Sequence, residues 1–452
     1  MSFDDTIAAI ATPLGEGGLA VVRISGPKAP AITDKVFAGK EKASAVPSHT
    51  IHFGKIVRDG RTIDEVLLAV LRAPRTFTRE DTVEISCHGG ILPAKLVLDV
   101  ILESGARLAE PGEFTRRAFL NGRIDLAQAE AVADLIHSRT ELALAAANEQ
   151  LAGQLSRRIN RLRDDLINIL AHVEAHIDFP DEDIAPDTRD QLLKRLDEGL
   201  AFIGQLLQTA NEGQILRRGI RAAIVGRPNS GKSSLLNQLL GRDRAIVSPI
   251  PGTTRDTIEE TANVRGLPVV FIDTAGLREA RDEIEIEGIR RSRQSLAQAE
   301  LILHVLDANQ PLTPEDESYF TEFAGKKRLF VRNKIDLPTR CELPSGLAQV
   351  VDISCVNGQG VELLKDSIKT MVWSGEINAE MLQVMINSRH QDALNRTRAA
   401  ALRTVETLRN NATLELVALD LRIAVAAVGE IVGKTTTEDL LDTIFGQFCI
   451  GK

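Results

Sequence analysis

The spacing of apolar residues divides the chain into segments of different kinds. In the first 118 residues, short apolar runs bounded by Gly and Pro are typical of strands: TIAAIATP (6–13), LAVVRISG (19–26), EVLLAVLRAP (65–74) and TVEISCHGG (82–90). The longer run ILPAKLVLDVILESG (91–105) has the length of a helix and ends at a glycine. The pattern therefore predicts a small α+β domain over residues 1–118.

From Phe119 the composition shifts to Ala, Leu and Glu, and the apolar period becomes helical. One stripe recurs at steps of four, three, four and four, which places its members on one helical face: Leu162, Leu166, Ile169, Val173 and Ile177. A second stripe follows much later: Val417, Leu421, Val425 and Val428. We predict one helical domain built from residues 119–210 and 377–452, with another domain inserted between its halves.

Residues 211–376 carry a third pattern. Apolar strand signals alternate with helical stretches, as in a parallel α/β sheet, and they read AAIVG, PVVFID, LILHVLD, RLFVRN and VVDIS. The predicted fold class is therefore multidomain: an N-terminal α+β domain, a discontinuous helical domain and an inserted α/β domain. Because nucleotides bind at the carboxyl ends of parallel strands, the residues after each strand are the candidates for chemistry.

The first of these strands is followed by GRPNSGKS (226–233) and then by leucines at helical spacing. A glycine-rich loop between a strand and a helix wraps its N–H groups around phosphates. Lys232 is expected to reach the β- and γ-phosphates, and the Ser233 hydroxyl to bind Mg²⁺. The sequence predicts a Ras-like P-loop G domain, whose phosphate loop also includes Asn229, Ser230, Gly231 and Ser234.

Two further motifs belong to the phosphate side. DTAG supplies Asp273, Thr274, Ala275 and Gly276, of which the carboxylate can hold Mg²⁺ through water and the Gly276 amide can sense the γ-phosphate. PGTTRD (251–256) supplies Thr254, whose hydroxyl can complete the Mg²⁺ shell. Leu277 stands where a water-orienting Gln would be expected, and neither Arg255 nor Arg278 is an obvious arginine finger.

RNKID places Asn333, Lys334 and Asp336 after a later strand. The Asp336 carboxylate can accept hydrogen bonds from the guanine N1–H and 2-amino groups, which adenine lacks, so GTP is the predicted nucleotide. Ser354 and Cys355 stand where many GTPases have Ser-Ala, which contacts guanine O6 through a backbone amide.

The net charge and the cysteine positions indicate which partners and which cell compartment to expect. Asp and Glu number 63 against 54 Lys and Arg, giving a net charge of −9, which argues against binding nucleic acid by bulk electrostatics. The four cysteines form no C-x-x-C pair, and no apolar run approaches the roughly 18 residues of a membrane helix. The N-terminus is acidic, unlike a secretory signal. We expect a cytoplasmic protein without a membrane partner.

The order of these motifs resembles one family. GRPNSGKS, PGTTRD, DTAGLREARDEIE and NKID lie between ATPLGEGGLAVVRISG and PGEFTRRAF on one side and a late FCIGK on the other. This arrangement, spread over essentially the whole chain, is similar to that of the MnmE (TrmE) family of tRNA modification GTPases. The resemblance implies a homodimer joined through the N-terminal domains. It also implies that an FAD-containing partner of the MnmG type modifies carbon 5 of the tRNA wobble uridine together with this chain.

The resemblance also assigns roles in hydrolysis. K⁺ is expected to supply the charge of an arginine finger, with Asn229 as one ligand and with Ser248, Ile250 and Thr253 in the loop that covers the ion; that loop also holds Pro249, Pro251 and Gly252. Glu285 matches the family's catalytic glutamate, although on sequence alone it is one of several acids in DEIEIE.

The N-terminal domain is expected, by the same resemblance, to bind a formyl-tetrahydrofolate at positions that match Arg23, Glu84, Arg123 and Lys452. Cys449 in FCIGK is a candidate nucleophile, and a small packed thiol is the alternative. His172 and His176, one helical turn apart, are weak candidates for a metal. A ribosome-assembly switch GTPase without modification chemistry remains the alternative function.

Overall fold

The computed structural model describes residues 4–178, 189–241, 260–272, 296–344, 349–373, 379–410 and 413–452. The chain forms two compact units. The first comprises Met1–Ala133, Ser156–Ala185 and Glu406–Lys452, and the second comprises Asp134–Leu155 and Pro186–Val405. The chain thus leaves the first unit and returns to it from the second.

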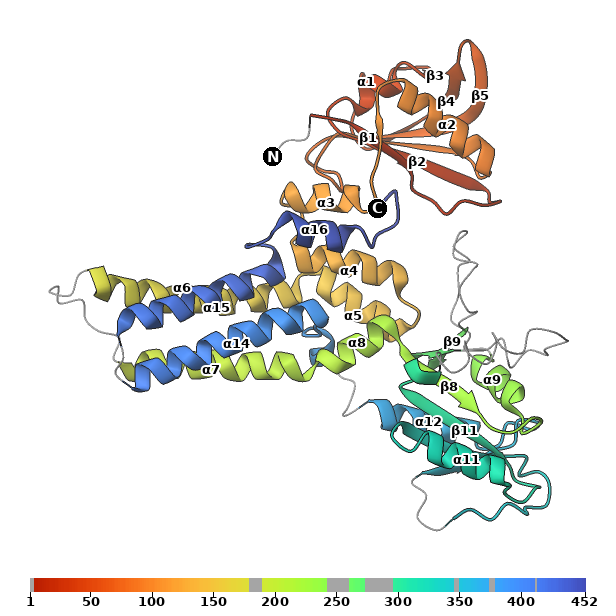
Figure 1. The fold of residues 1–452 in the computed structure, drawn as a ribbon. Helices are drawn as coiled ribbons and strands as arrows, with labels where there is room; N and C mark the ends of the chain where they lie inside the picture. The colour runs from red at the N-terminus through yellow and green to blue at the C-terminus, as the bar shows by residue number, and fades with distance from the viewer. Residues whose placement is uncertain are drawn as a thin grey trace. The chain divides into compact units, whose positions relative to one another are not determined.

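The first unit contains a seven-stranded sheet. Its strands are β1 (Ile7–Ile10), β2 (Leu19–Ser25), β3 (Phe37–Gly39), β4 (Thr50–Arg58), β5 (Arg61–Leu71), β6 (Thr82–His88) and β7 (Arg107–Leu108). The order is β3-β4-β5-β6-β2-β1-β7, and every pairing is antiparallel except β1 with β7. Helix α1 (Ala29–Thr33) follows β2, and helix α2 (Ile91–Glu103) packs on the sheet (Figure 1).

Alternation of side chains gives this sheet two different faces. Val22 and Ile24 of β2 are buried in the core that α2 covers, through Val97 and Ile101 among others. Arg23, between them in sequence, therefore points to the other face of the sheet. The strands predicted from the four apolar runs are present, whereas β3, β4 and β7 were not predicted.

The helices of the first unit are α3 (Glu113–Leu120), α6 (Gln154–Asp178), α15 (Leu414–Val432), α16 (Glu438–Phe445) and the start of α4 (Leu126–His137). Leu126 of α4 shares an apolar core with Leu441 and Phe445 of α16. Arg422 of α15 forms an ion pair with Glu174 of α6 at 2.7 Å. Of the two predicted stripes, all members are buried except the half-buried Ile177 and Val425, so both apolar faces are confirmed.

The second unit contains a six-stranded sheet in the order β13-β12-β11-β8-β10-β9. The strands are β8 (Ile220–Val225), β9 (Glu260–Val264), β10 (Leu267–Phe271), β11 (Leu301–Asp307), β12 (Lys327–Asn333) and β13 (Val350–Asp352). All pairings are parallel except β9 with β10. The five predicted strands are confirmed, and β9 was not predicted.

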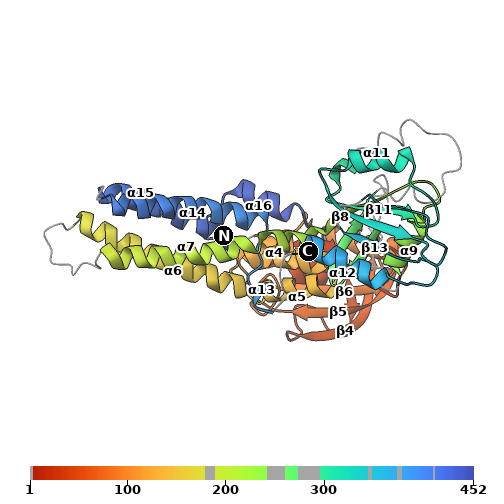
Figure 2. The ribbon, with the colours of Figure 1, turned by 90° about the horizontal axis from the view of Figure 1, so that it is seen from below.

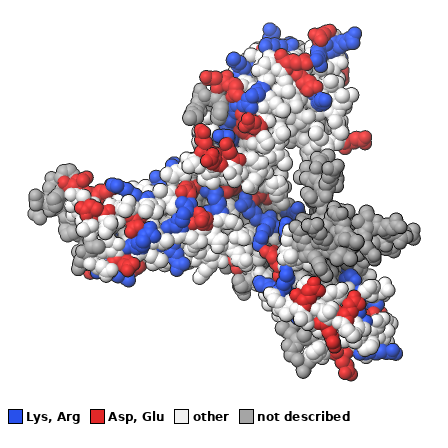
Figure 3. Space-filling model, in the orientation of Figure 1, with Lys and Arg blue, Asp and Glu red and all other residues white. Residues whose placement is uncertain are grey.

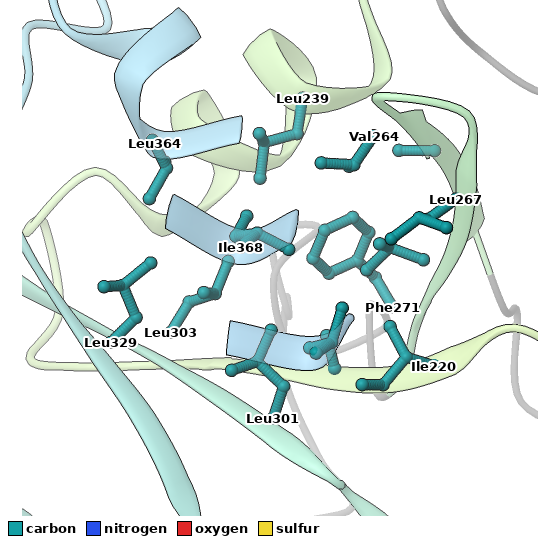
Figure 4. Packing of buried hydrophobic residues seen from close by; sticks show 14 of the residues in the cluster. Ile220, Leu239, Val264, Leu267, Phe271, Leu301, Leu303, Leu329, Leu364 and Ile368 are labelled. Carbon is teal, nitrogen blue, oxygen red and sulfur yellow. The ribbon is translucent and has the colours of Figure 1, made fainter. Parts of the chain in front are cut away.

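Helices cover both faces of this sheet (Figure 2). Helices α9 (Lys232–Leu240) and α12 (Val361–Val372) lie on one face, where Leu239, Ile368 and Leu303 share the main core (Figure 4). Helix α11 (Pro314–Glu322) lies on the other, where Tyr319 packs near Ile302. Elsewhere in the described ranges lie the helices α5 (Glu141–Leu151), α7 (Arg189–Gln208), α8 (Ala210–Arg218), α13 (Ala379–Leu382) and α14 (Ser388–Arg409).

Basic and acidic side chains are interspersed on the face of the molecule drawn in Figure 3. Across the described ranges, no helix has both the length and the apolar character that a membrane span requires.

Candidate functional site

The loop between β8 and α9 has the backbone of a phosphate cradle. Gly226 has φ +143°, and a Cβ there would lie 2.2 Å from the Val305 carbonyl oxygen of β11. Gly231, with φ +98°, is the N-cap of α9. Only glycine meets both the positive φ and the close approach at these positions, which explains the G-x-x-x-x-G spacing.

Lys232 begins α9, and its Nζ donates hydrogen bonds to the carbonyl oxygens of Gly226 and Arg227, both at 2.8 Å. Burial lowers the pKa of Lys232 below its ordinary value. A phosphate group beside this ammonium would stabilise the charged form. Ser233 and Ser234 follow in the first turn, where helix N–H groups face an anion. The predicted phosphate-binding residues Ser230 to Ser234 are therefore together at one helix start.

Asn229 adopts the left-handed region with φ +62°. Asn tolerates this conformation better than other residues with side chains. Its carbonyl oxygen accepts a hydrogen bond from Lys334 Nζ at 2.8 Å, while its side chain lies at the exposed rim of the loop. The role predicted for Asn229 as a K⁺ ligand stays a prediction.

Asn333 joins the loops of the predicted base site to the phosphate loop. Its Nδ2 donates to the Ser230 carbonyl oxygen at 3.0 Å, and its Oδ1 accepts from the Cys355 amide at 3.1 Å. The Ser354 hydroxyl donates to Asp336 Oδ1 at 2.5 Å, which orients the carboxylate predicted to read guanine. The structure thus brings together the residues predicted to bind guanine, Asn333, Lys334, Asp336, Ser354 and Cys355, and their contacts with the base stay a prediction.

Cys355 stands where many GTPases have alanine, and its main chain still forms the hydrogen bonds that hold this loop. Burial raises the pKa of its thiol to about 11, and the Asp336 charge adds to the effect. The Cys355 carbonyl oxygen accepts a hydrogen bond from Gln238 Nε2 of α9 at 2.8 Å. The backbone is therefore held in place while the thiol stays protonated, consistent with a contact made through the main chain.

Two acidic residues of this region were not predicted. Asp307 ends β11 and accepts a hydrogen bond from Lys334 Nζ at 2.6 Å. Asp316 of α11 forms an ion pair with Arg227 at 2.8 Å, and it also closes a capping box with Thr313. The T-x-x-D capping pattern is visible in the sequence, but the ion pairs join segments about 30 to 90 residues apart and leave no local signal.

The remaining half of the predicted hydrolytic site lies outside the described residues. These positions are Ser248, Pro249, Ile250, Pro251, Gly252, Thr253, Thr254, Asp273, Thr274, Ala275, Gly276 and Glu285. Their predicted contacts with Mg²⁺, K⁺ and the γ-phosphate stay predictions.

A second candidate site lies in the first unit. Arg23 of β2 is opposite Glu84 of β6 in the strand register, and their side chains form an ion pair at 2.7 Å. The Arg23 guanidinium also lies over the Phe114 ring, 5.7 Å from its centroid, and donates to the Gly451 carbonyl oxygen at 3.3 Å. Two of the four predicted folate residues thus meet directly.

The other two predicted folate residues are Arg123, which lies beside an aromatic ring, and Lys452, which follows Gly451 in the chain. Arg123 lies over Phe77, 5.3 Å from the ring centroid, and Phe77 packs against the buried cluster that includes Phe114. Lys452 follows Gly451, whose carbonyl contacts Arg23, and its amide donates to the Cys449 carbonyl oxygen at 3.3 Å. The arrangement gives two guanidinium groups and one carboxylate beside the buried Phe114 and the half-buried Phe77, which suits an acidic ligand.

Backbone contacts fix the tail that carries Cys449. Ile450 forms a bridge with Pro111, and the Cys449 carbonyl oxygen accepts from the Gly112 amide at 3.4 Å. Gly451 has φ +97°, and a Cβ there would lie 2.4 Å from the Ile10 carbonyl oxygen. The Cys449 side chain is exposed. An exposed thiol therefore lies two residues before Gly451, whose carbonyl oxygen contacts Arg23.

His172 and His176 do converge, with Nε2 atoms 3.3 Å apart on α6. Within the described ranges, no group of three or more His, Cys, Asp or Glu side chains could hold a metal ion. The pair by itself does not make a metal centre of the usual kind.

The cradle at the start of α9, the mainly parallel sheet and the Asn-Lys-x-Asp loop show that the second unit contains a P-loop G domain. Two family models match the chain: one described as the MnmE helical domain, over residues 126–449, and one as the GTP-binding protein TrmE N-terminus, over residues 6–123. The chain belongs to the MnmE family of tRNA modification GTPases.

Relatives of nearly equal length support this membership. A tRNA modification GTPase MnmE of Listeria welshimeri is 48% identical over 454 residues, covering 99% of each chain. One of Geobacter sulfurreducens is 46% identical over 457 residues, covering 100% of each. Among solved structures, Aquifex aeolicus Era bound to GDP·AlF4⁻ is 29% identical, with a TM-score of 0.26 over 40% of this chain and 66% of that chain.

Proposed function

We propose that this chain hydrolyses GTP in the service of tRNA modification at carbon 5 of the wobble uridine, together with an FAD-containing partner of the MnmG type. The observation that carries the proposal is that Asn333 bonds to the Ser230 carbonyl of the phosphate loop while Ser354 bonds to Asp336, within a chain whose relatives are named tRNA modification GTPases. The chain would consist of four segments, residues 1–118, 119–210, 211–376 and 377–452, and the third of them would be the G domain.

Nucleotide recognition is divided between two groups of residues. The Asp336 carboxylate, held by Ser354, accepts the guanine N–H groups, and the main chain of the Ser354–Cys355 loop would face O6. Lys232 and the start of α9 neutralise the phosphates. Ser233, with Thr254 and Asp273 from outside the described residues, would hold Mg²⁺, which offsets the charge that develops as the γ-phosphate leaves.

The monovalent cation is the second element of the mechanism. Leu277 leaves no glutamine to orient water, and no arginine finger is evident, so another positive charge is required near the β–γ bridge. Asn229 would hold K⁺ with Ser248, Ile250 and Thr253, because its carbonyl is fixed by Lys334 while its side chain lies at the exposed rim. Glu285 would orient the attacking water.

The first unit would bind the one-carbon donor. A formyl-tetrahydrofolate presents a carboxylate tail for Arg23 and Arg123 and pterin N–H groups for Glu84, with Lys452 adding charge. Cys449 is the candidate nucleophile, because its exposed thiol lies on the tail that contacts Arg23. Arginine–aromatic contacts would hold both guanidinium groups ready for the ligand.

A homodimer through the first unit is supported by an apolar surface on its sheet. Ile51 and Phe53 of β4 are 69% and 65% exposed, and Leu67 pairs opposite Phe53 in the register. Exposed large apolar residues adjacent on one sheet face mark an interaction surface. The proposed reaction on tRNA, together with an FAD-containing partner, suits a cytoplasmic protein.

Nucleoside mass spectrometry tests this function. Cells depleted of the protein would be rescued with the wild type, with Lys232→Ala and with Gly204→Ala, the last because Gly204 lies in open space on α7. We expect the wobble uridines to lose their carbon-5 substituent on depletion, and to regain it with wild type and Gly204→Ala only. Unchanged nucleosides on depletion would instead favour the ribosome-assembly switch.

A further inference from the structure

Asp307 lies at the centre of a contact that connects the base side and the phosphate side of the G domain. Its side chain is only 6% exposed, and Oδ2 accepts from Lys334 Nζ at 2.6 Å. Its other oxygen accepts from the Asn309 amide at 2.9 Å. Both carboxylate oxygens therefore have partners, and the orientation of the carboxylate is fixed by the turn that follows β11.

Lys334 is constrained from three sides. Its backbone has φ +68°, an unfavourable conformation for a residue with a side chain. Its ammonium donates to Asp307 and to the Asn229 carbonyl oxygen, which is 2.8 Å away. Its side chain is therefore stretched between the end of β11 and the phosphate loop, and its methylene stem is held in one path.

We propose that Asp307 is a positioning residue for GTP. Through its ion pair with Lys334 it holds the Asn-Lys-x-Asp loop in place on the base side of the site, and it fixes the left-handed turn at Asn229. A neutral residue at 307 would leave the ammonium with the Asn229 carbonyl alone, so Lys334 would sample other rotamers. Nucleotide binding would then have to order the Lys334 side chain, and the lost conformational entropy would weaken the binding free energy. The turn at Asn229, which has φ +62°, would be held less firmly, because Lys334 makes the only side-chain contact to its carbonyl found among the described residues.

The binding experiment uses the full chain and a fluorescent GDP analogue at fixed ionic strength. Asp307→Asn is nearly isosteric and keeps an oxygen for the Asn309 amide, so the fold is retained; Asp307→Ser is a second neutral variant with the same expected effect. The matched control is Asp366→Asn, which removes an exposed ion pair to Arg265 at 2.6 Å elsewhere in the unit. We expect both Asp307 variants to weaken GDP binding about tenfold or more, and the control to change it less than about twofold.

A double-mutant cycle separates positioning from general damage. If Asp307 acts through Lys334, Asp307→Asn weakens binding little further once Lys334→Met is present. Wild-type affinity in both Asp307 variants would overturn the proposal, and so would a full Asp307→Asn penalty in the Lys334→Met background. Intrinsic fluorescence of Trp373 in urea, with an unchanged midpoint in Asp307→Asn, shows that the fold is intact.

The link to Asn229 rests on the proposed K⁺ function and has its own measurement. The K⁺ concentration for half-maximal GTP hydrolysis is expected to rise several-fold in Asp307→Asn. An unchanged K⁺ response together with weakened GDP binding would overturn this link alone. If wild type shows no activation by K⁺, the proposed cation role fails, whereas the GDP measurements still decide the role of Asp307.

Discussion

Gly231 faces the side chain of Asn333 so closely that a methyl group on Gly231 would lie 2.1 Å from the Asn333 Nδ2 atom. The same Nδ2 donates to the Ser230 carbonyl oxygen, so the approach that excludes a methyl group is the one that joins the two nucleotide-binding loops. A single methyl group added at Gly231 is therefore expected to disrupt the contact between these two loops.

Gly231→Ala is expected to abolish GTP binding, since it adds both this clash and strain at φ +98°. Gly204→Ala is the matched control: it lies in α7 with nothing within 4 Å, and should raise stability by about 0.5–1 kcal/mol. Isothermal titration with GDP and urea unfolding measure both effects. Normal GDP binding by Gly231→Ala would contradict the geometry of the loop.

Asp336→Asn should exchange guanine for xanthine specificity, because an amide presents a donor where xanthine has an oxygen. We expect GTP affinity to fall by a hundredfold or more, on the order of 3 kcal/mol for an unpaired buried polar group, while xanthosine triphosphate gains. Competition binding with the two nucleotides measures the exchange. Retained preference for GTP would remove Asp336 from the base site.

Asn229→Gly removes the side-chain amide while preserving a backbone that accepts φ +62°. Wild-type GTP turnover is expected to be several-fold faster in KCl than in NaCl at equal ionic strength, and this ratio should approach one in the variant. GDP affinity should persist, since Lys334 contacts the carbonyl of residue 229 rather than its side chain. A variant that keeps the KCl advantage would exclude Asn229 as a K⁺ ligand.

Glu84→Gln should weaken formyl-tetrahydrofolate binding about tenfold by removing a charge from the pterin contacts and from Arg23. Glu65→Gln removes a more exposed ion pair, to Lys55 on the same sheet, and serves as the control. Calorimetric titration of both variants decides the point, with equal affinities counting against the folate site. GTP hydrolysis should not change in either variant.

His304 makes the second unit sensitive to acid. The imidazole is fully buried among Tyr319, Phe320 and Phe330, and neither ring nitrogen has a hydrogen-bond partner among the described residues. Burial, with a contribution from the Arg328 charge, lowers the pKa of His304 to about 4. Because the unfolded state takes up this proton near pH 6.5, stability is full above that pH and is lost as the pH falls toward 4.

The predicted loss over this window is about 3 kcal/mol, from a pKa difference of roughly 2.5 at 1.36 kcal/mol per unit. Urea unfolding followed by Trp373, the single tryptophan, measures it, since this side chain is buried in the core of the same unit. His304→Phe should flatten the curve between pH 6.5 and 4. The exposed His137, changed to Gln, should leave it unaltered, and an unaltered curve in His304→Phe would be the contrary result.

The sequence predicted the G domain well because its strands are buried on both faces and read as continuous apolar runs. It missed β4, where Ile51 and Phe53 point outward and Gly54 points inward, so the expected alternation is inverted. It also missed β9, whose first residues, Glu260 and Thr261, are polar yet buried.

Site residues within one motif were predictable, since a few adjacent positions carry the chemistry of a phosphate loop or an N-K-x-D loop. Asp307 was not, because its role exists only once Lys334, 27 residues later, lies beside it. The division of the helical region between the two units was equally invisible, since the apolar stripes show which face of a helix is buried but not which neighbour buries it.

The hydrogen bond between Arg23 and the carbonyl of Gly451 spans 428 residues of chain. During synthesis, Arg23 and the sheet around it emerge first, yet Gly451 and the bridge partner Ile450 emerge only after the whole second unit has been made. The G domain can therefore fold while the first unit still lacks its last contacts. A chain interrupted before Phe448 would have a nucleotide site but would lack the contact between Arg23 and Gly451, so GTP binding could survive a truncation that removes the proposed folate binding.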